Sequence, residues 1–113
     1  MKVIAPLSQD KKLTIVLRVE SGCLGPEGSN HVENFCRTAL TTIEQINSDF
    51  LIWEVLPRLD KYLPEIQYKA AQKTLTHDQA RKYLALFDTK IDEFEEHINE
   101  KLTILIEQYM EDL

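Results

Sequence analysis

The chain has 113 residues, of which 43% are hydrophobic and 28% charged, and its formal net charge is −6. This length and composition are typical of one globular domain with a hydrophobic core of its own. No apolar run approaches the roughly 20 residues of a membrane-spanning helix, and the first residues lack the pattern of a signal peptide. We therefore expect a single domain over residues 1–113, located in the cytoplasm and not in a membrane.

The first clear element is a strand over residues 12–20. Leu13, Ile15, Leu17 and Val19 alternate with residues that are mostly polar. A period of two indicates a strand with one buried face and one face that is mostly wet. This pattern predicts a sheet in a two-layer fold.

A glycine-rich loop follows this strand, and Gly22, Gly25 and Gly28 give it the spacing GxxGxxG. Dinucleotide loops need GxGxxG, and phosphate loops end in Gly-Lys-Ser or Gly-Lys-Thr. No lysine or arginine lies between Glu20 and Arg37 to attract a phosphate. We interpret the three glycines as residues that let the chain turn sharply, and we expect no cofactor.

Cys23 lies in the same loop, shortly before the start of a predicted helix, where a helix dipole favours the reactive thiolate. His31 follows eight residues later and would serve as a base if the two side chains met. The other interpretation is an ordinary free thiol. Cys36 falls in an apolar stripe, so we expect it in the core, and we expect both cysteines to be reduced.

A helix is predicted over residues 30–47, because apolar residues recur there at steps of three and four. Asn30 is the expected cap, with Glu33 three residues later. Residues 50–57 then predict a second strand, apolar on both faces and therefore expected at the centre of the sheet. A third strand over 65–70 is expected to form a hairpin with it.

Two helices are predicted in the C-terminal part, over residues 76–87 and 90–112. Thr76 and Gln79 have the spacing of a capping box at the start of the first. The second would span about 30 Å, which is longer than the core of a small domain requires. Its apolar stripe widens near the end, which predicts an interface there. Together with the tryptophan of the second strand, the candidate binding residues are Trp53, Leu102, Leu105, Ile106, Tyr109 and Met110.

The acidity of the chain is confined to its last part. Residues 88–113 contain nine acidic and two basic residues, a net charge of −7, whereas residues 1–87 have a net charge of +1. An acidic C-terminal helix would be repelled by phosphates, so we exclude binding to duplex nucleic acid. His31, His77 and His97 are scattered along the chain, and their spacing predicts no metal site.

These patterns together predict an α+β domain with about three strands in a mostly antiparallel sheet, packed against three helices. The first two strands would be joined through the first helix by a parallel crossover. For the function, we expect a non-enzymatic module that binds another protein or regulates one, most simply as a homodimer. The alternative is a thiol-dependent enzyme or redox protein that uses Cys23 and His31.

Overall fold

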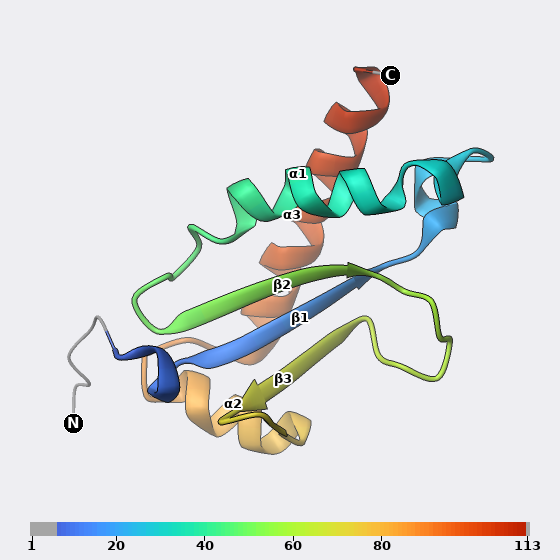
Figure 1. Cartoon of the computed structure of the whole chain (residues 1–113). Helices are drawn as coiled ribbons and strands as arrows, with labels where there is room; N and C mark the ends of the chain where they lie inside the picture. The colour runs from blue at the N-terminus through green and yellow to red at the C-terminus, as the bar shows by residue number, and fades with distance from the viewer. Residues whose placement is uncertain (1–6, 113) are drawn as a thin grey trace.

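The computed structural model describes residues 7–112 as an α+β fold in two layers, with a four-stranded mixed sheet and three helices (Figure 1). The sheet has the strand order β2-β1-β3-β4. β1 pairs with β2 in parallel and with β3 antiparallel, and β3 pairs antiparallel with β4. The bounds are β1 Leu13–Val19, α1 Val32–Ile43, β2 Leu51–Pro57, β3 Ile66–Ala70, β4 Lys73–Thr74, α2 His77–Ala85 and α3 Ile91–Glu111.

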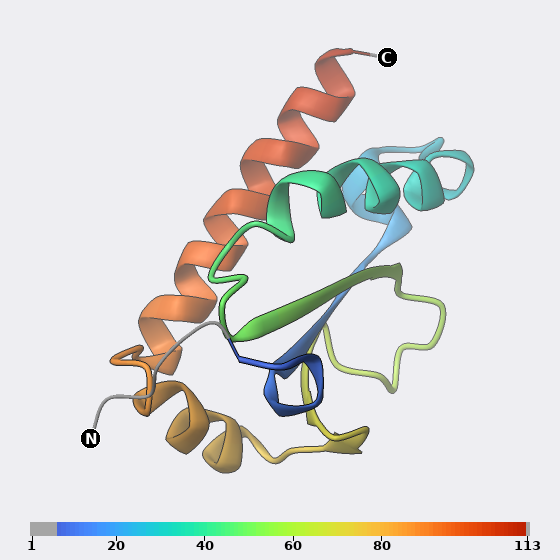
Figure 2. The ribbon, with the colours of Figure 1, turned by 60° about the vertical axis from the view of Figure 1, so that its left-hand side comes forward.

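The core lies between one face of the sheet and the helices. Leu13, Ile15, Leu17 and Val19 of β1 belong to this core, together with residues of all three helices. In Figure 1, α2 and α3 pass behind the strands, and Figure 2 shows the three helices around one side of the sheet. On the opposite face of the sheet Glu54 is exposed, Arg18 and Ile52 are half-buried, and Val16 at the middle of β1 is buried.

The sequence predicted that the second strand lies at the centre of the sheet, and this prediction is wrong. β2 lies at one edge of the sheet, and β1 occupies the interior between β2 and β3. The two faces of β2 have different surroundings, because Leu51, Trp53 and Val55 point into the core while Glu54 and Leu56 are exposed. Apolar residues on both faces of this strand therefore reflect a partly apolar surface and not burial on both sides.

The parallel crossover from β1 through α1 to β2 is confirmed by the pairing of Leu13 with Leu51 and of Val19 with Pro57. The predicted hairpin between the second and third strands is wrong, because β1 lies between them. Residues 58–65 instead cross the end of β1, where the N–H of Arg18 donates to the carbonyl oxygen of Glu65 at 2.8 Å. The connection between β2 and β3 therefore passes over the end of β1.

The helix ends were predicted with unequal accuracy. α1 begins at Val32 and not at Asn30, because Gly28–Asn30 form a short 3₁₀ turn and the Asn30 amide donates to Glu27 at 3.0 Å. The capping box of α2 is confirmed. The Thr76 hydroxyl accepts from the Gln79 N–H at 3.1 Å, and the Gln79 side chain accepts from the Thr76 N–H at 2.9 Å.

The sheet also contains a short fourth strand that the sequence did not predict. Ala71 and Gln72, with φ values of 49° and 67°, form the tight turn between β3 and β4. Positive φ at both central residues is the geometry of a two-residue hairpin, which normally takes Asn-Gly or Asp-Gly. Because those residues are missing here, this hairpin has no strong signal in the sequence.

Candidate functional site

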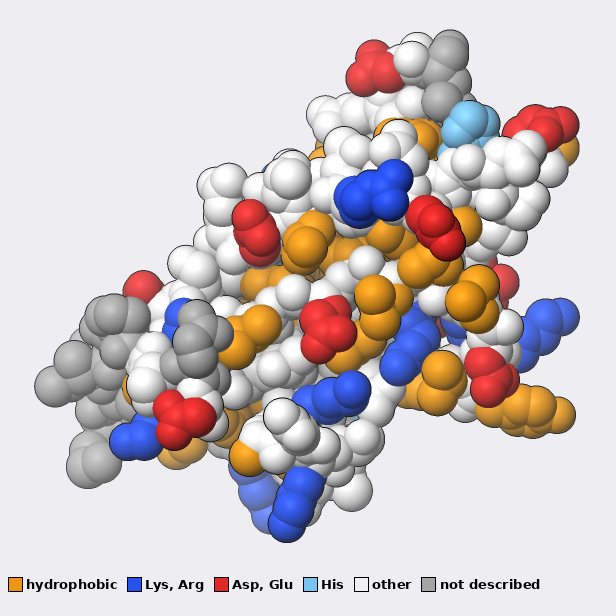
Figure 3. Space-filling view, in the orientation of Figure 1, with side chains coloured by type: hydrophobic (Ala, Val, Ile, Leu, Met, Phe, Trp, Pro, Cys, Tyr) orange, Lys and Arg blue, Asp and Glu red, His pale blue; other side chains and the backbone are white. Residues whose placement is uncertain are grey.

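Exposed large hydrophobic side chains are concentrated where β2 ends. Of seven such side chains among the described residues, four lie within residues 56–63: Leu56, Leu59, Tyr62 and Leu63. We call these four residues the loop patch. Leu59 is 89% exposed and Tyr62 is 97% exposed. Figure 3, in the orientation of Figure 1, shows hydrophobic side chains over the face of the sheet opposite the core and over the adjoining loop, separated by single charged groups. Exposed apolar surface of this kind is typical of binding regions.

Arg58 holds the connection between β2 and β3 in a defined shape. Its Nε donates to the carbonyl oxygen of Leu63 at 3.0 Å, and its Nη2 donates to that of Lys61 at 2.9 Å. Its Nη1 pairs with Glu20 and lies 3.6 Å from a carboxylate oxygen of Glu65. The planar guanidinium group suits several fixed acceptors at once. The arginine therefore orders the backbone that carries Leu59 and Tyr62.

Two further hydrogen bonds stabilise this loop, one local and one from β1. The Asp60 carboxylate accepts from the backbone N–H of Tyr62 at 2.9 Å, which is the local turn that aspartate favours. The side chain of Arg18, on β1, donates to the carbonyl oxygen of Pro64 at 3.0 Å. Two apolar side chains are thus exposed on an ordered backbone, so a partner would have little loop entropy to remove.

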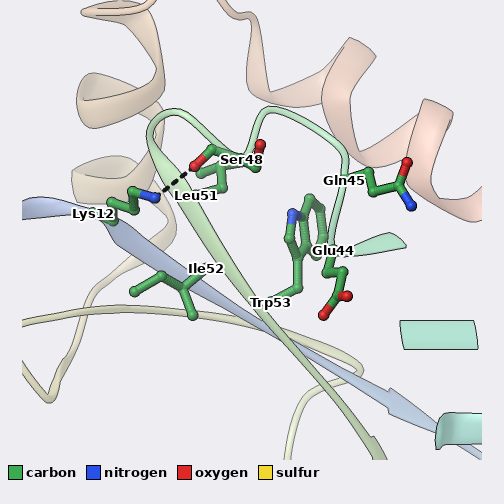
Figure 4. Close-up of a pocket in the computed structure, with 7 residues that line it drawn as sticks. All are labelled: Lys12, Glu44, Gln45, Ser48, Leu51, Ile52 and Trp53. Atoms are coloured by element: carbon green, nitrogen blue, oxygen red, sulfur yellow. Dashed lines mark hydrogen bonds between the residues drawn. The ribbon is translucent and has the colours of Figure 1, made fainter. Parts of the chain in front are cut away.

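A groove lies at the other end of β2. Its volume is about 570 Å³ and it is lined by Lys12, Glu44, Gln45, Ser48, Leu51, Ile52 and Trp53. Figure 4 shows these side chains around the start of the strand, with Trp53 and Ile52 on different sides of β2. The Lys12 ammonium donates to the carbonyl oxygen of Ser48 at 2.7 Å, which links the start of β1 to the segment before β2.

Trp53 itself belongs to the core. It is 5% exposed, its indole N–H donates to the carbonyl oxygen of Ile46 at 2.8 Å, and its ring stacks on Phe94 with centroids 5.9 Å apart. A tryptophan with its N–H satisfied and its ring stacked is a packing residue. The structure therefore places Trp53 away from the exposed surface, although its edge lines the groove.

The apolar stripe of α3 is half covered. Leu102, Leu105, Ile106 and Tyr109 pack partly against the core, and Met110 is exposed. The Tyr109 ring meets Phe35 edge-on at 5.4 Å, and its hydroxyl accepts from the Asn34 amide at 2.9 Å. The last turns of α3 extend past α1 in both ribbon views. α1 therefore covers one side of the stripe and leaves the other side at the surface.

The structure places Cys23 and His31 in different surroundings. Cys23 is exposed and lines a cavity of about 170 Å³ together with Arg18, Val19, Glu20, Glu65, Asn99, Leu102, Thr103 and Ile106. His31 does not line this cavity, and its ring instead packs edge-on against Tyr109 with centroids 6.2 Å apart. The proposed thiol and base are therefore not brought together around this cavity.

At two of the three loop glycines, the backbone conformation or a close contact explains why the residue is glycine. Gly25 has a φ of 84°, which a residue with a side chain rarely adopts. A Cβ at Gly28 would lie 1.7 Å from the carbonyl oxygen of Ser21, so only glycine fits there. At Gly22 a Cβ would meet nothing within 4 Å. Gly25 and Gly28 thus let the two 3₁₀ turns of this loop, Ser21–Leu24 and Gly28–Asn30, fold against each other.

One ionisable cluster joins β3 to the two C-terminal helices. The buried Tyr68 hydroxyl donates to the Glu95 carboxylate at 2.7 Å, and His77 lies 3.4 Å from the same carboxylate. Burial, and then the neighbouring Glu95, raise the pKa of Tyr68 far above its usual value. Because none of the cavities described above is lined by these residues, the cluster connects elements of the fold.

The loop patch is the feature that sequence reasoning missed. Leu59, Tyr62 and Leu63 are apolar residues in a connection bracketed by Pro57 and Pro64. Apolar residues outside any periodic segment were the available signal. Their exposure follows only from the way Arg58 folds the connection, which involves Glu20 from a distant part of the chain.

Within residues 7–112, no helix has the length and apolar character required to cross a membrane. The same residues contain no group of three or more histidine, cysteine, aspartate or glutamate side chains suited to hold a metal ion. Comparisons with protein-family models, curated proteins and solved structures found no match. The function is therefore argued from the geometry of this chain.

Proposed function

We propose that this chain is a non-enzymatic protein-binding module that acts as a homodimer in the cytoplasm. The observation that carries the proposal is the loop patch, because Leu59 and Tyr62 are almost fully exposed on an ordered backbone. Isolated apolar side chains are common on protein surfaces, but a group of four within eight residues is not. Ordering by Arg58 supports a binding role, because a preorganised loop loses little entropy on binding.

A second copy is the simplest partner because β2 carries complementary features at its two ends. The loop patch follows its C-terminal end, and the groove of about 570 Å³ adjoins its N-terminal end. A twofold axis beside the middle of β2 would place each loop patch next to the groove of the other copy. Twofold contacts of this self-complementary kind are the commonest form of oligomer among soluble proteins.

The test is the solution mass of the full chain by size-exclusion chromatography with light scattering, from low micromolar to millimolar concentration. We expect a concentration-dependent shift from the mass of one chain to that of two. Replacing Leu59 with serine should weaken the dimer, since this exposed leucine lies beside β2. Leu86→Ser is the matched control, because Leu86 is also exposed but follows α2. A strict monomer at millimolar concentration would contradict the proposal.

Thiol chemistry at Cys23 is the second candidate, favoured by the cavity of about 170 Å³ that this residue lines. Arg18, Glu20 and Glu65 line the same cavity as the sulfur. The rate of alkylation by iodoacetamide at neutral pH, compared with that of glutathione, decides the matter. A rate about tenfold above that of glutathione would support an activated thiol, and an equal rate would contradict this second candidate.

A further inference from the structure

The two edges of the sheet differ in length. β4 has two residues and includes Lys73, whereas β2 has seven residues over Leu51–Pro57. Very short edges that carry lysine resist pairing with another strand, and long edges invite it. In the described part of the chain, no strand lies on the outer side of β2.

Two backbone hydrogen bonds fix which groups of β2 point outward. The N–H of Leu13 donates to the carbonyl oxygen of Phe50 at 3.0 Å, and the N–H of Arg58 donates to that of Val19 at 2.8 Å. Alternate residues of a strand direct their backbone groups to opposite sides. Even-numbered residues of β2 therefore bond to β1, and odd-numbered residues direct their N–H and C=O groups to the outer edge.

Two N–H groups are left free on this edge. Leu51 donates its N–H to the carbonyl oxygen of Asn47 at 3.0 Å, and Pro57 has no N–H. Trp53 and Val55 remain, and within residues 7–112 their N–H groups have no partner in another segment. The side chains of these two residues are buried in the core, so it is their backbone that lies at the edge. Unpaired N–H groups along a long sheet edge are available to pair with another strand.

We propose that the outer edge of β2 pairs antiparallel with β2 of a second copy, which joins two four-stranded sheets into one sheet of eight strands. This inference rests on the proposed homodimer and names its interface. A strand from an unrelated protein would leave a new free edge on its own outer side. Pairing of the two β2 strands removes both long edges and leaves only the two-residue β4 strands outside.

Glu54 limits the register. A pairing centred on Glu54 would place this carboxylate directly opposite its counterpart, and like charges in that position are destabilising. Pairings centred on Trp53 or on Val55 avoid this contact. Both leave the free N–H groups of these two residues facing carbonyl oxygens of the odd-numbered residues in the other copy, and we expect one of these two registers.

The test uses residue-resolved amide exchange of the full chain by NMR, under dilute and concentrated conditions. The N–H groups of Trp53 and Val55 should exchange at least about tenfold more slowly in the concentrated sample. The neighbouring N–H groups of Ile52 and Glu54 should change little, because both already bond to β1. The strand thus contains its own internal control, one residue away from each reporter.

A pair of lysine variants provides a second test. Ile52→Lys places a charge on the edge strand, and Thr14→Lys places one at the paired position of the interior strand β1. The effect of Ile52→Lys depends on the register: in the pairing centred on Val55 the new lysine faces Arg58 of the other copy, so the concentration-dependent mass and the protection of Trp53 and Val55 should be lost. In the pairing centred on Trp53 it faces Glu54 of the other copy, so both should be retained. Thr14→Lys should retain both, and exchange of the Leu17 amide shows whether each variant keeps the folded sheet.

The possible failures are distinguishable. A dimer whose Trp53 and Val55 amides gain no protection would overturn the β2 interface and leave the proposed function intact. A chain that remains monomeric at millimolar concentration would overturn both. Strong protection of the two amides in a sample whose mass is that of one chain would mean that the edge is covered within that chain, and would also overturn the β2 pairing.

Discussion

The C-terminal half of α3 and the loop patch are both apolar surfaces, and they differ in how they are held. The stripe of α3 is periodic and half covered, and its Tyr109 contacts Phe35 and Asn34 of α1. The loop patch has no periodicity and is almost fully exposed at Leu59 and Tyr62. Periodicity thus marks the surface that the chain partly covers itself, whereas the bare surface lies on a loop with no periodic signal.

The difference shows why a long amphipathic helix overstates its own exposure. A second element of the same chain packs against the stripe, so only part of it remains for a partner. The loop patch has no such cover, because Arg58 uses its contacts to hold the backbone and not to shield the side chains. Three changes test this contrast, taken from the largest expected effect to the smallest.

The largest effect is expected along α3 itself. Ile98 is 1% exposed, so Ile98→Ala should lower the free energy of unfolding by about 3 to 4 kcal/mol through a cavity. Ile104 is exposed on the same helix, and Ile104→Ala should change it by less than about 0.5 kcal/mol. Urea denaturation monitored by Trp53 fluorescence measures both. Equal decreases in the free energy of unfolding for the two variants would mean that the C-terminal half of α3 is as much a part of the core as the first half.

The next prediction tests whether the buried face of α1 is shielded from solvent. Burial, and then Glu33, raise the pKa of the Cys36 thiol from 9.0 to about 11. Below pH 9 the thiol keeps its proton in both states. Between pH 9 and pH 11 the unfolded chain releases it first, so the free energy of unfolding should fall by up to about 3 kcal/mol as pH rises.

Cys36→Ala is the control for this titration, because lysine and tyrosine groups titrate equally in both proteins. Urea denaturation across this pH range should show a steeper loss for the parent chain than for the variant. Identical pH dependence would mean that solvent reaches the thiol and that α1 does not seal this face.

The smallest of the three effects concerns the loop patch. Arg58→Ala removes two hydrogen bonds to carbonyl oxygens and the pairing with Glu20, which should cost about 2 kcal/mol. The amides of residues 59–63 should then exchange faster. Arg58→Lys keeps the charge without the planar fork, so it should restore only part of the order. Unchanged exchange in Arg58→Ala would show that the loop is ordered without the arginine, and would weaken the contrast with α3.

Much of the fold was predictable because several of its determinants are local. The alternation of Leu13 to Val19 is a local pattern, and so is the capping box of Thr76 and Gln79. The start of α1 was misplaced because the Asn30 amide bonds to Glu27, so two local options competed. Strand order was misjudged because the apolar residues of β2 indicate apolar surroundings without saying which neighbours supply them.

The sequence alone determined the α+β class, the parallel crossover through α1, the approximate helix ends and the confinement of acidity to the last part of the chain. Tertiary structure decided that β2 is an edge strand and that Trp53 is a core residue. It also separated Cys23 from His31 and exposed Leu59 and Tyr62 on an ordered loop. The physical reason is range: periodicity and capping act within a few residues, whereas an edge, a cavity or an exposed patch depends on which distant segments pack beside it.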